Sequence, residues 1–411
     1  MLPLILLSAL LGLCSSSLSG NGHGGIIRDG LLAELLKANQ GNLSSNMLIS
    51  PFSISAALNL AYAGAAGNTA KQFEASALFE KHSVAEVGSR LEDIKATMDV
   101  RNSNFSSAQA LFVQKDLALK PAFVAACRTE KTCAYQQVNF LASLKTEDVI
   151  NGWVSKQTQG RIEHLVSAAD LNRDTKLAVL DAGAFKIPFP ESETRRAAFF
   201  MPQALTLETL LCYLFPFPIC KVEGSVEMMS FGRAVALPYY ENSLLQALAL
   251  PFKSKMGGQE ELLIVLPKQP DNQRPITDLL TPDLGQEISG GLREQEVLVQ
   301  LPKWKVETPL INLNRPLQAL GLRDAFTGRA DFSNIFPNAS GIAINKVLHK
   351  ATFEVSEKGS ETSGGSAAQF QRKASLGGPS GPPKVFTANR PFLYGVVVNR
   401  AVTLFAGIFA N

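Results

Sequence analysis

A basic pair, Arg372-Lys373, is followed by the small residue Ala374 inside a stretch of small and polar residues. A long basic side chain on an accessible backbone suits a protease whose specificity pocket holds a carboxylate, because the opposite charges attract. The same pair could instead be an incidental surface feature or a site for a processing protease. The residues therefore suggest a peptide bond that a protease could cleave beside Arg372 or Lys373, with these alternatives open.

Residues that could carry out catalysis or bind a metal are scarce elsewhere in the chain. Four histidines are present, so a Ser/His/Asp hydrolase would have few candidates for its base, and no Gly-x-Ser-x-Gly motif occurs. The glycines form neither a phosphate-binding loop nor a dinucleotide fingerprint. Cysteines and histidines lack the spacing of metal ligands. The sequence predicts a protein that is not an enzyme and uses no metal and no cofactor.

Composition and the N-terminus indicate where the protein works. The 411 residues include 39 basic and 36 acidic side chains, a net charge of +3, which favours neither nucleic acid nor an acidic membrane as a partner. Residues 1–19 form a short apolar run that ends in small residues, as a cleaved secretory signal peptide does, with a buried N-terminal helix as the alternative. No later stretch is long and apolar enough to anchor the chain. We expect a secreted, extracellular protein without a membrane segment.

Secretion changes how the cysteines and several asparagines are interpreted. Two close cysteine pairs could each close a small loop in an oxidising compartment, although free or cross-paired thiols stay open as alternatives. Three Asn-x-Ser triplets fit a glycoprotein. The residues concerned are Cys127 with Cys133, Cys212 with Cys220, and the acceptor candidates Asn42, Asn104 and Asn338.

The spacing of apolar residues along the chain predicts the helices and strands around the basic pair. Helical spacing of apolar residues dominates the first half, whereas alternating segments at 261–266, 297–301 and 393–408 favour strands in the second half. This distribution suggests an α+β fold rather than repeated βαβ units. The tract 357–384 is too rich in small residues, glycine and proline to pack a core, so we expect an exposed loop. The strand-like residues after it are too few for a domain and should return to the main body.

Several segments resemble the serpin family, the serine protease inhibitor superfamily, and they occur in the family's order across nearly the whole chain. One such match would be weak, whereas a series in order is specific. The matching segments are Asn46–Leu58 with Gly64–Ala70, Ile150–Val154, Leu301–Val306, Asn345–Glu361, Asn389–Tyr394 and Leu404–Ile408.

The resemblance implies a single domain over residues 20–411, a monomer with three β-sheets, about nine helices and an exposed reactive loop at about 357–385. In this family a serine protease attacks the loop and forms an acyl-enzyme. The cut loop then enters the central sheet as a new strand, which drags the protease across the molecule and distorts its active site. The inhibitor is consumed once. The partner implied here is a trypsin-like serine protease.

Family spacing places the cleaved bond at Lys373–Ala374, with Arg372–Lys373 as the alternative. The hinge that precedes the loop would comprise Glu357, Gly359, Ser360, Glu361 and Thr362. Alternate loop residues from Ser360 to Phe370 are uncharged and, except for Phe370, small. A strand buries alternate side chains on one face, and a buried unpaired charge is costly, so this pattern is compatible with entry into a sheet.

The chain departs from the family in its central strand, where it reads Asp181-Ala-Gly-Ala-Phe-Lys and lacks a tryptophan that normally packs where the loop begins to enter. Asp181 takes the place of an asparagine that lies near Ser53 and His349 in a polar cluster governing sheet opening. Taken alone, His349 would be an ordinary hydrogen-bonded core histidine. The missing tryptophan and Gly364-Gly365, which lowers strand propensity, leave an alternative open: a non-inhibitory serpin that acts as a binding or carrier protein or as a cleavable protease substrate.

Overall fold

The computed structural model describes most of the chain between residues 46 and 410. The described residues are 46–76, 79, 82–97, 104–129, 134–189, 193–200, 223–253, 259–268, 284–357, 382–398 and 402–410. Their strands form one sheet of six strands and one of ten. The α-helices among them are α3 (Pro51–Gly64), α4 (Gly67–Ala75), α5 (Val84–Thr97), α6 (Pro121–Thr129), α7 (Ser143–Gln157), α9 (Leu284–Gly291) and α10 (Asn314–Ala319).

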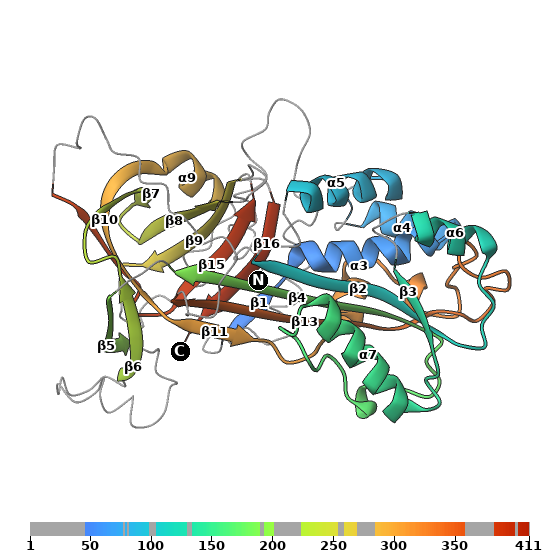
Figure 1. Ribbon diagram of the computed structural model, residues 1–411. Coiled ribbons are helices and arrows are strands. Elements are labelled where there is room, and N and C mark those ends of the chain that lie inside the picture. The colour runs from blue at the N-terminus through green and yellow to red at the C-terminus, as the bar shows by residue number, and fades with distance from the viewer. Residues whose placement is uncertain are drawn as a thin grey trace, which may run out of the picture.

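The six-stranded sheet runs through the long axis of the molecule (Figure 1) in the order β11–β13–β4–β2–β3, with β12 also paired to β13. Strands β4 and β13 are parallel neighbours, whereas β2 is antiparallel to β4 and β11 is antiparallel to β13. The strands are β2 (Phe105–Gln114), β3 (Tyr135–Val138), β4 (Leu177–Phe189), β11 (Trp304–Glu307), β12 (Ile311–Asn312) and β13 (Ile344–Glu357).

Strand β4 is apolar on both faces because both faces are covered. Val179 and Phe185 belong to the main core, while Leu180 and Ala182 belong to a second cluster on the opposite side of the sheet. A strand buried on both faces is expected to be almost continuously hydrophobic. Asp181 is the buried charged residue of this strand, so it needs hydrogen-bonding partners.

Two helices cover the faces of this sheet. Helix α3 packs on β2, β4 and β16, and α7 lies across the other side, over β2 (Figure 1). Ser50 caps the N-terminus of α3 by accepting the backbone N–H of Ser53, and Pro51 occupies the first helical turn, where its missing N–H costs nothing. On the α7 side, Trp153 meets Phe112 edge to face at 5.5 Å.

The ten-stranded sheet has the order β1–β16–β15–β9–β8–β7–β10–β6–β5, and β14 pairs with the free side of β10. Strand β10 joins two parts, because residues 293–297 pair with β7 and residues 300–302 pair with β6. The six-stranded sheet and these two parts correspond to the three sheets implied by the resemblance. The strands are β1 (Met47–Ile49), β5 (Glu193–Phe200), β6 (Glu223–Ser230), β7 (Val235–Glu241), β8 (Leu245–Lys253), β9 (Gln259–Pro267), β10 (Arg293–Pro302), β14 (Lys384–Thr387), β15 (Phe392–Val398) and β16 (Val402–Phe409).

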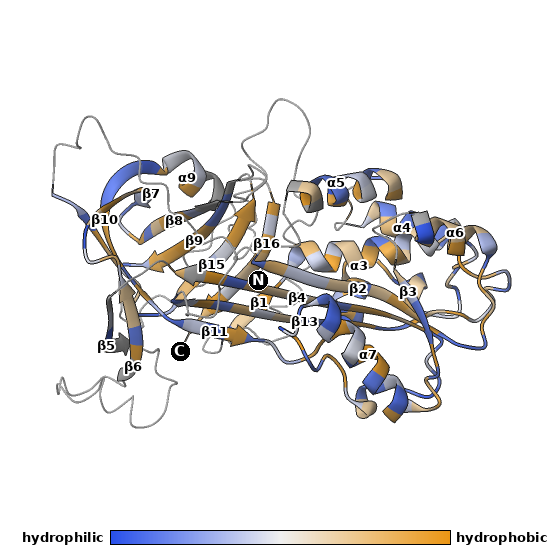
Figure 2. Ribbon diagram, in the orientation of Figure 1, coloured by the Kyte–Doolittle hydropathy of each residue, from blue (hydrophilic) through white to orange (hydrophobic). Residues whose placement is uncertain are grey.

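The core lies where the two sheets and α3 meet, and hydrophobic colouring is concentrated there on β15, β16 and α3 (Figure 2). Aromatic side chains form its centre: Phe353 lies 4.8 Å from Tyr394 and 6.0 Å from Trp304, measured between ring centroids. The strands expected at 261–266, 297–301 and 393–408 are confirmed as β9, β10 and the β15–β16 pair. The α+β fold is confirmed as well.

Candidate functional site

The boundary between β4 and β13 is the feature around which the site is built, and we call it the seam. It pairs the two strands from Ile344 opposite Leu177 to Glu357 opposite Phe189. Strand β13 ends at Glu357, at the start of the tract that the sequence marks as a loop, and the described chain resumes at Pro382, just before β14. The seam is thus a closed ladder whose second strand ends where the expected loop tract begins.

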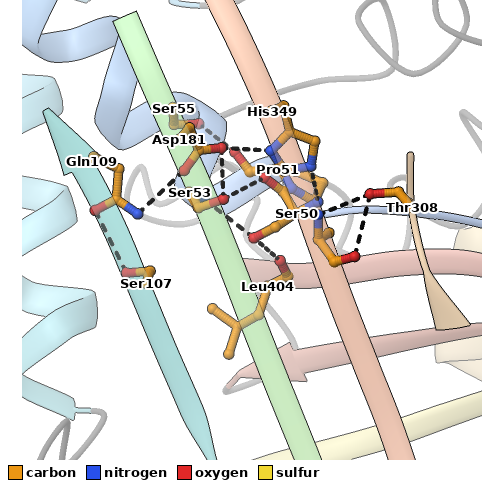
Figure 3. Close-up of polar contacts among 11 residues, drawn as sticks. Ser50, Pro51, Ser53, Ser55, Ser107, Gln109, Asp181, Thr308, His349 and Leu404 are labelled. Carbon is orange, nitrogen blue, oxygen red and sulfur yellow. Dashed lines mark hydrogen bonds and ion pairs between the residues drawn. The ribbon is translucent and has the colours of Figure 1, made fainter. Parts of the chain in front are cut away.

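A polar cluster lies in the middle of the seam, and Figure 3 shows its contacts. Asp181 on β4 and His349 on β13 are directly opposite in register, and their Oδ2 and Nδ1 atoms are 2.6 Å apart. The hydroxyl of Ser53 in α3 donates to the same carboxylate oxygen at 2.9 Å. The structure therefore brings together Ser53, Asp181 and His349, which the sequence analysis grouped.

Two further members of the cluster were not expected from the sequence. Gln109 on β2 donates through Nε2 to Oδ1 of Asp181 at 3.3 Å, and the backbone N–H of Ser50 donates to Nε2 of His349 at 3.3 Å. The second bond places the imidazole proton on Nδ1, since a protonated Nε2 would face another donor. Ser50 also donates through its hydroxyl to the carbonyl of Leu404 on β16 at 2.8 Å, which ties the cluster to the second sheet.

Close approach at the seam depends on Gly183, two residues after Asp181. A Cβ atom there would lie 3.1 Å from Cβ of Ser50 and 3.2 Å from Oγ of Ser53. Such contacts are tighter than normal packing allows. The absence of a side chain at Gly183 therefore lets α3 pack directly on β4.

The hydrogen bonds of the cluster hold α3, β4 and β13 together, and they do not activate a serine nucleophile. Ser53 donates to Asp181, whereas a hydrolase serine would donate to the imidazole. Asp181 and His349 are 1% and 0% exposed, so no substrate reaches them. Within the described ranges no group of three metal-ligating side chains occurs, and no described helix is long and apolar enough to cross a membrane.

At the hinge end of the seam, Glu357 is held by polar contacts from the second sheet. Its carboxylate lies 2.9 Å from Nζ of Lys303, which also binds Glu227 on β6 at 3.1 Å. The hydroxyl of Thr194 on β5 donates to the other oxygen of Glu357. The pKa of Lys303 is raised, mainly by the hydrogen bond to Glu357. The hinge residues from Gly359 to Thr362 lie outside the described residues.

The far side of the loop is anchored at β14. Lys384, the first residue of that strand, binds Glu241 at 2.7 Å, and Lys268 binds the same carboxylate at 2.8 Å. Hydrogen bonds from Lys268 and then Lys384 are the main reasons why the pKa of Glu241 falls to about 2. Gln246 donates to the backbone carbonyl of Val385 at 3.0 Å. Charged contacts therefore hold the described residues on both sides of this tract.

The face of the seam that points to α7 is covered by residues 158–172, which we call the strap. Lys350 on β13 donates to the carbonyl of His164 at 2.8 Å, and Lys346 donates to the carbonyl of Asp170. On the other side, Arg161 donates to the carbonyl of Asn104 at 2.8 Å. Since the strap is fixed to both sides of the seam, a strand that enters between β4 and β13 must disturb these bonds.

Of the cysteines and glycosylation candidates singled out in the sequence, the structure describes Cys127, Asn104 and Asn338. Cys127 is disulfide-bonded. Asn338 is exposed and Asn104 is half-buried. The remaining candidates lie outside the described residues. They are the signal peptide at 1–19, Asn42, Cys133, Cys212, Cys220, and the residues beside the expected cleaved bond, Arg372, Lys373 and Ala374.

Comparison with known proteins decides the family. A family model described as serpin (serine protease inhibitor) matches residues 31–411. This chain belongs to the serpin family. It is 30% identical over 388 residues to the leukocyte elastase inhibitor of Homo sapiens, covering 92% of this chain and 96% of that protein. Iripin-2 of Ixodes ricinus is 28% identical over 383 residues, covering 90% of this chain and 89% of Iripin-2.

Solved structures agree with the fold. Native protease nexin-1 with heparin superposes with a TM-score of 0.72 at 22% identity, covering 93% of this chain and 96% of that one. A structure titled a tumour suppressing serpin gives a TM-score of 0.72 at 22% identity and covers 100% of both chains. At such identity, these likenesses establish the serpin fold, and the family match establishes a protease-inhibitor family.

Proposed function

We propose that this serpin is a suicide-substrate inhibitor that traps a trypsin-like serine protease after cleavage at Lys373–Ala374. The observation that supports this most is the seam: β4 and β13 are parallel neighbours, and β13 ends at Glu357, where the expected reactive loop begins. A strand that folds back from Glu357 would run antiparallel to both. It could satisfy the backbone groups of both seam strands, which gives the cut loop a place to enter.

The length of the loop fits this destination. From Gly359 to Lys373 an extended strand spans about 48 Å, at roughly 3.4 Å per residue. Strand β13 has 14 residues, which span about 44 Å by the same measure, so the two lengths are similar. A loop that enters completely would therefore carry an attached protease along the whole seam, from the hinge end to the opposite edge of the sheet.

Specificity for a trypsin-like protease is proposed from the loop itself. The relatives include inhibitors named for leukocyte elastase, whereas this chain places two basic residues, Arg372 and Lys373, at the expected bond. A basic side chain pairs with a carboxylate at the base of a specificity pocket, and an apolar pocket would leave it unpaired and desolvated. Arg372–Lys373 is the second candidate bond, with the same class of protease.

Secretion and glycosylation are part of the proposal. The apolar run at 1–19 has the form of a signal peptide. Cys127 is disulfide-bonded, which suits an oxidising compartment, and the acceptor Asn338 is exposed. One specific feature favours a second function, namely a cleaved substrate or a carrier: Gly364-Gly365 weakens the strand that has to form.

The experiment is incubation with trypsin followed by a denaturing, non-reducing gel. The proposal expects a covalent band at the summed mass of both proteins, and this band should be lost in Lys373→Ala combined with Arg372→Ala. Lys71→Ala, which changes an exposed basic residue on α4 away from the seam and the loop, serves as the control and should retain the band. Complete cleavage without a covalent band would refute inhibition and favour the second function.

A further inference from the structure

Among the described residues, the end of β4 beside the hinge pairs with a strand on one side only. Pairing between β2 and β4 stops at Phe105 opposite Phe185, and the described strand that pairs with the following residues of β4 is β13. The last bond on the β2 side is from the backbone N–H of Lys186 to the carbonyl of Asn104, at 2.9 Å. A strand segment with one partner frays unless side chains hold it in place.

Pro188 lies in this segment without interrupting the seam. Alternate residues of a strand direct their N–H groups to the same side, and Lys186 directs its N–H toward β2. The missing N–H of Pro188 therefore faces the side where β2 has already ended. The N–H groups of Ile187 and Phe189 face β13, so the seam keeps its ladder up to the hinge.

Phe189, the last residue of β4, is a buried aromatic side chain at this end. It is 1% exposed and lies opposite Glu357. Its ring stacks on Phe231 with centroids 4.7 Å apart and an interplanar angle of 24°. Phe231 follows β6 directly, and Gly232 after it has a φ of 67°, a backbone conformation suited to glycine that lets the chain turn away from the stack.

Strand β6 thereby contacts both sides of the seam at the hinge end. It reaches β4 through the stack of Phe231 on Phe189, and it reaches β13 through Glu227, Lys303 and Glu357. The two contacts differ in kind. The polar contact can exchange its partners for water, whereas the stack loses its buried area when it separates. We therefore expect the contact to β13 to break first when the seam opens, while the end of β4 stays in place.

We propose that the Phe189–Phe231 stack is a positioning element that holds the end of β4 in register while the seam opens on its β13 side. It occupies the place where this chain lacks the tryptophan of its family. The proposal extends the proposed function and depends on it only for the consequence in inhibition. Without the stack, residues 186–189 fray, and the first loop residues find no ordered strand to pair with.

The test is amide hydrogen exchange on the intact, uncut protein, followed by mass spectrometry. In Phe189→Ala we expect exchange in the segment 185–189 to be about tenfold faster than in the natural protein, since the stack sets the local opening. Phe231→Ala should have the same effect. Phe189→Trp, which keeps an aromatic ring, should exchange as slowly as the natural protein. Phe189→Leu keeps apolar volume without stacking, so it tests the idea even if the alanine variant folds poorly.

The matched control is Phe73→Ala, because Phe73 is also 1% exposed and stacks on Tyr62 with centroids 5.4 Å apart, away from the seam. It should leave exchange in 185–189 unchanged. Equal exchange in Phe189→Leu and the natural protein would overturn the proposal.

A second readout separates this proposal from the proposed function. With trypsin, the Phe189 variants should consume several times more inhibitor molecules per trapped protease while the loop is cut at the same rate. An unchanged ratio would refute the positioning effect. If the natural protein traps no protease at all, the proposed function fails, whereas the exchange experiment still decides whether the stack holds β4.

Discussion

Replacement of Asp181 by alanine tests how the seam is kept closed. Asp181 is 1% exposed and accepts hydrogen bonds from His349, Ser53 and Gln109. Alanine leaves the imidazole N–H of His349 buried without this acceptor, while the Ser53 hydroxyl keeps only its longer contact with the carbonyl of Ser50, at 3.3 Å. Removing one partner of such a buried polar group costs about 3–5 kcal/mol of unfolding free energy. Asp181→Asn keeps an acceptor for His349 and should cost only about 1 kcal/mol.

The form of the protein matters for this comparison. In the uncut protein Asp181 and His349 are adjacent across the seam, and an inserted strand would separate them. We therefore expect Asp181→Ala to weaken the uncut form strongly and the loop-cleaved form much less. Guanidinium unfolding, followed through the fluorescence of the chain's two tryptophans, measures both forms. We expect the difference between the unfolding midpoints of the cleaved and uncut forms to be larger in Asp181→Ala than in the natural protein.

The control for this experiment is Asp324→Ala. Asp324 also accepts hydrogen bonds, from Asn68 at 2.6 Å and from Arg329 at 2.9 Å, but it lies outside the seam. This variant should shift the uncut and cleaved forms equally. If Asp181→Ala behaves in the same way, with equal losses in both forms, then the cluster is not specific to the closed seam and the reasoning is wrong.

Three further predictions concern the ends of the loop and the packing of the seam. Glu357→Gln removes the ion pair with Lys303, which is partly exposed, so thermal unfolding should show a loss of about 0.5–1 kcal/mol in the uncut form; no loss would argue against a charged hinge contact. Glu241 has a pKa lowered from 4.5 to about 2, so its stabilising effect is complete above pH 4.5 and is lost as the pH falls through 2. The natural protein should therefore exceed Glu241→Gln in stability at pH 7, and this difference should shrink below pH 4.5 and vanish near pH 2; a constant difference would contradict the ion-pair origin. Gly183→Ala forces a Cβ against α3 and should cost about 1–3 kcal/mol by urea unfolding, whereas Gly152→Ala, where a Cβ would meet nothing within 4 Å, should cost nothing.

Local patterns in the sequence account for much of the fold. The alternating segments became β9, β10, β15 and β16, because period-two alternation and β-branched residues report directly on strands. The Ser-Pro pair at residues 50 and 51 carries a helix-start signal, and α3 begins there. The family resemblance supplied the cluster of Ser53, Asp181 and His349, which the structure brings within hydrogen-bonding distance.

The contacts that escaped prediction are those set by register. Gln109 contacts Asp181 because the two residues are direct partners across β2 and β4, and a shift by one residue would turn Gln109 to the other face. Lys303 meets Glu357 only because β11 and β6 converge on the end of β13. Phe231 reaches Phe189 across a similar distance in sequence. Sequence patterns do not encode such pairings until the sheet is assembled.

Thermal melting of the intact and the trypsin-nicked protein is the most direct test of loop insertion into the seam. We expect cleavage at Lys373–Ala374 to raise the melting temperature well above that of the intact form, because the freed strand pairs with both β4 and β13. Mass spectrometry of the nicked sample identifies the bond that was cut. A nicked protein that melts at the same temperature as the intact one, or below it, would contradict insertion of the loop into the seam.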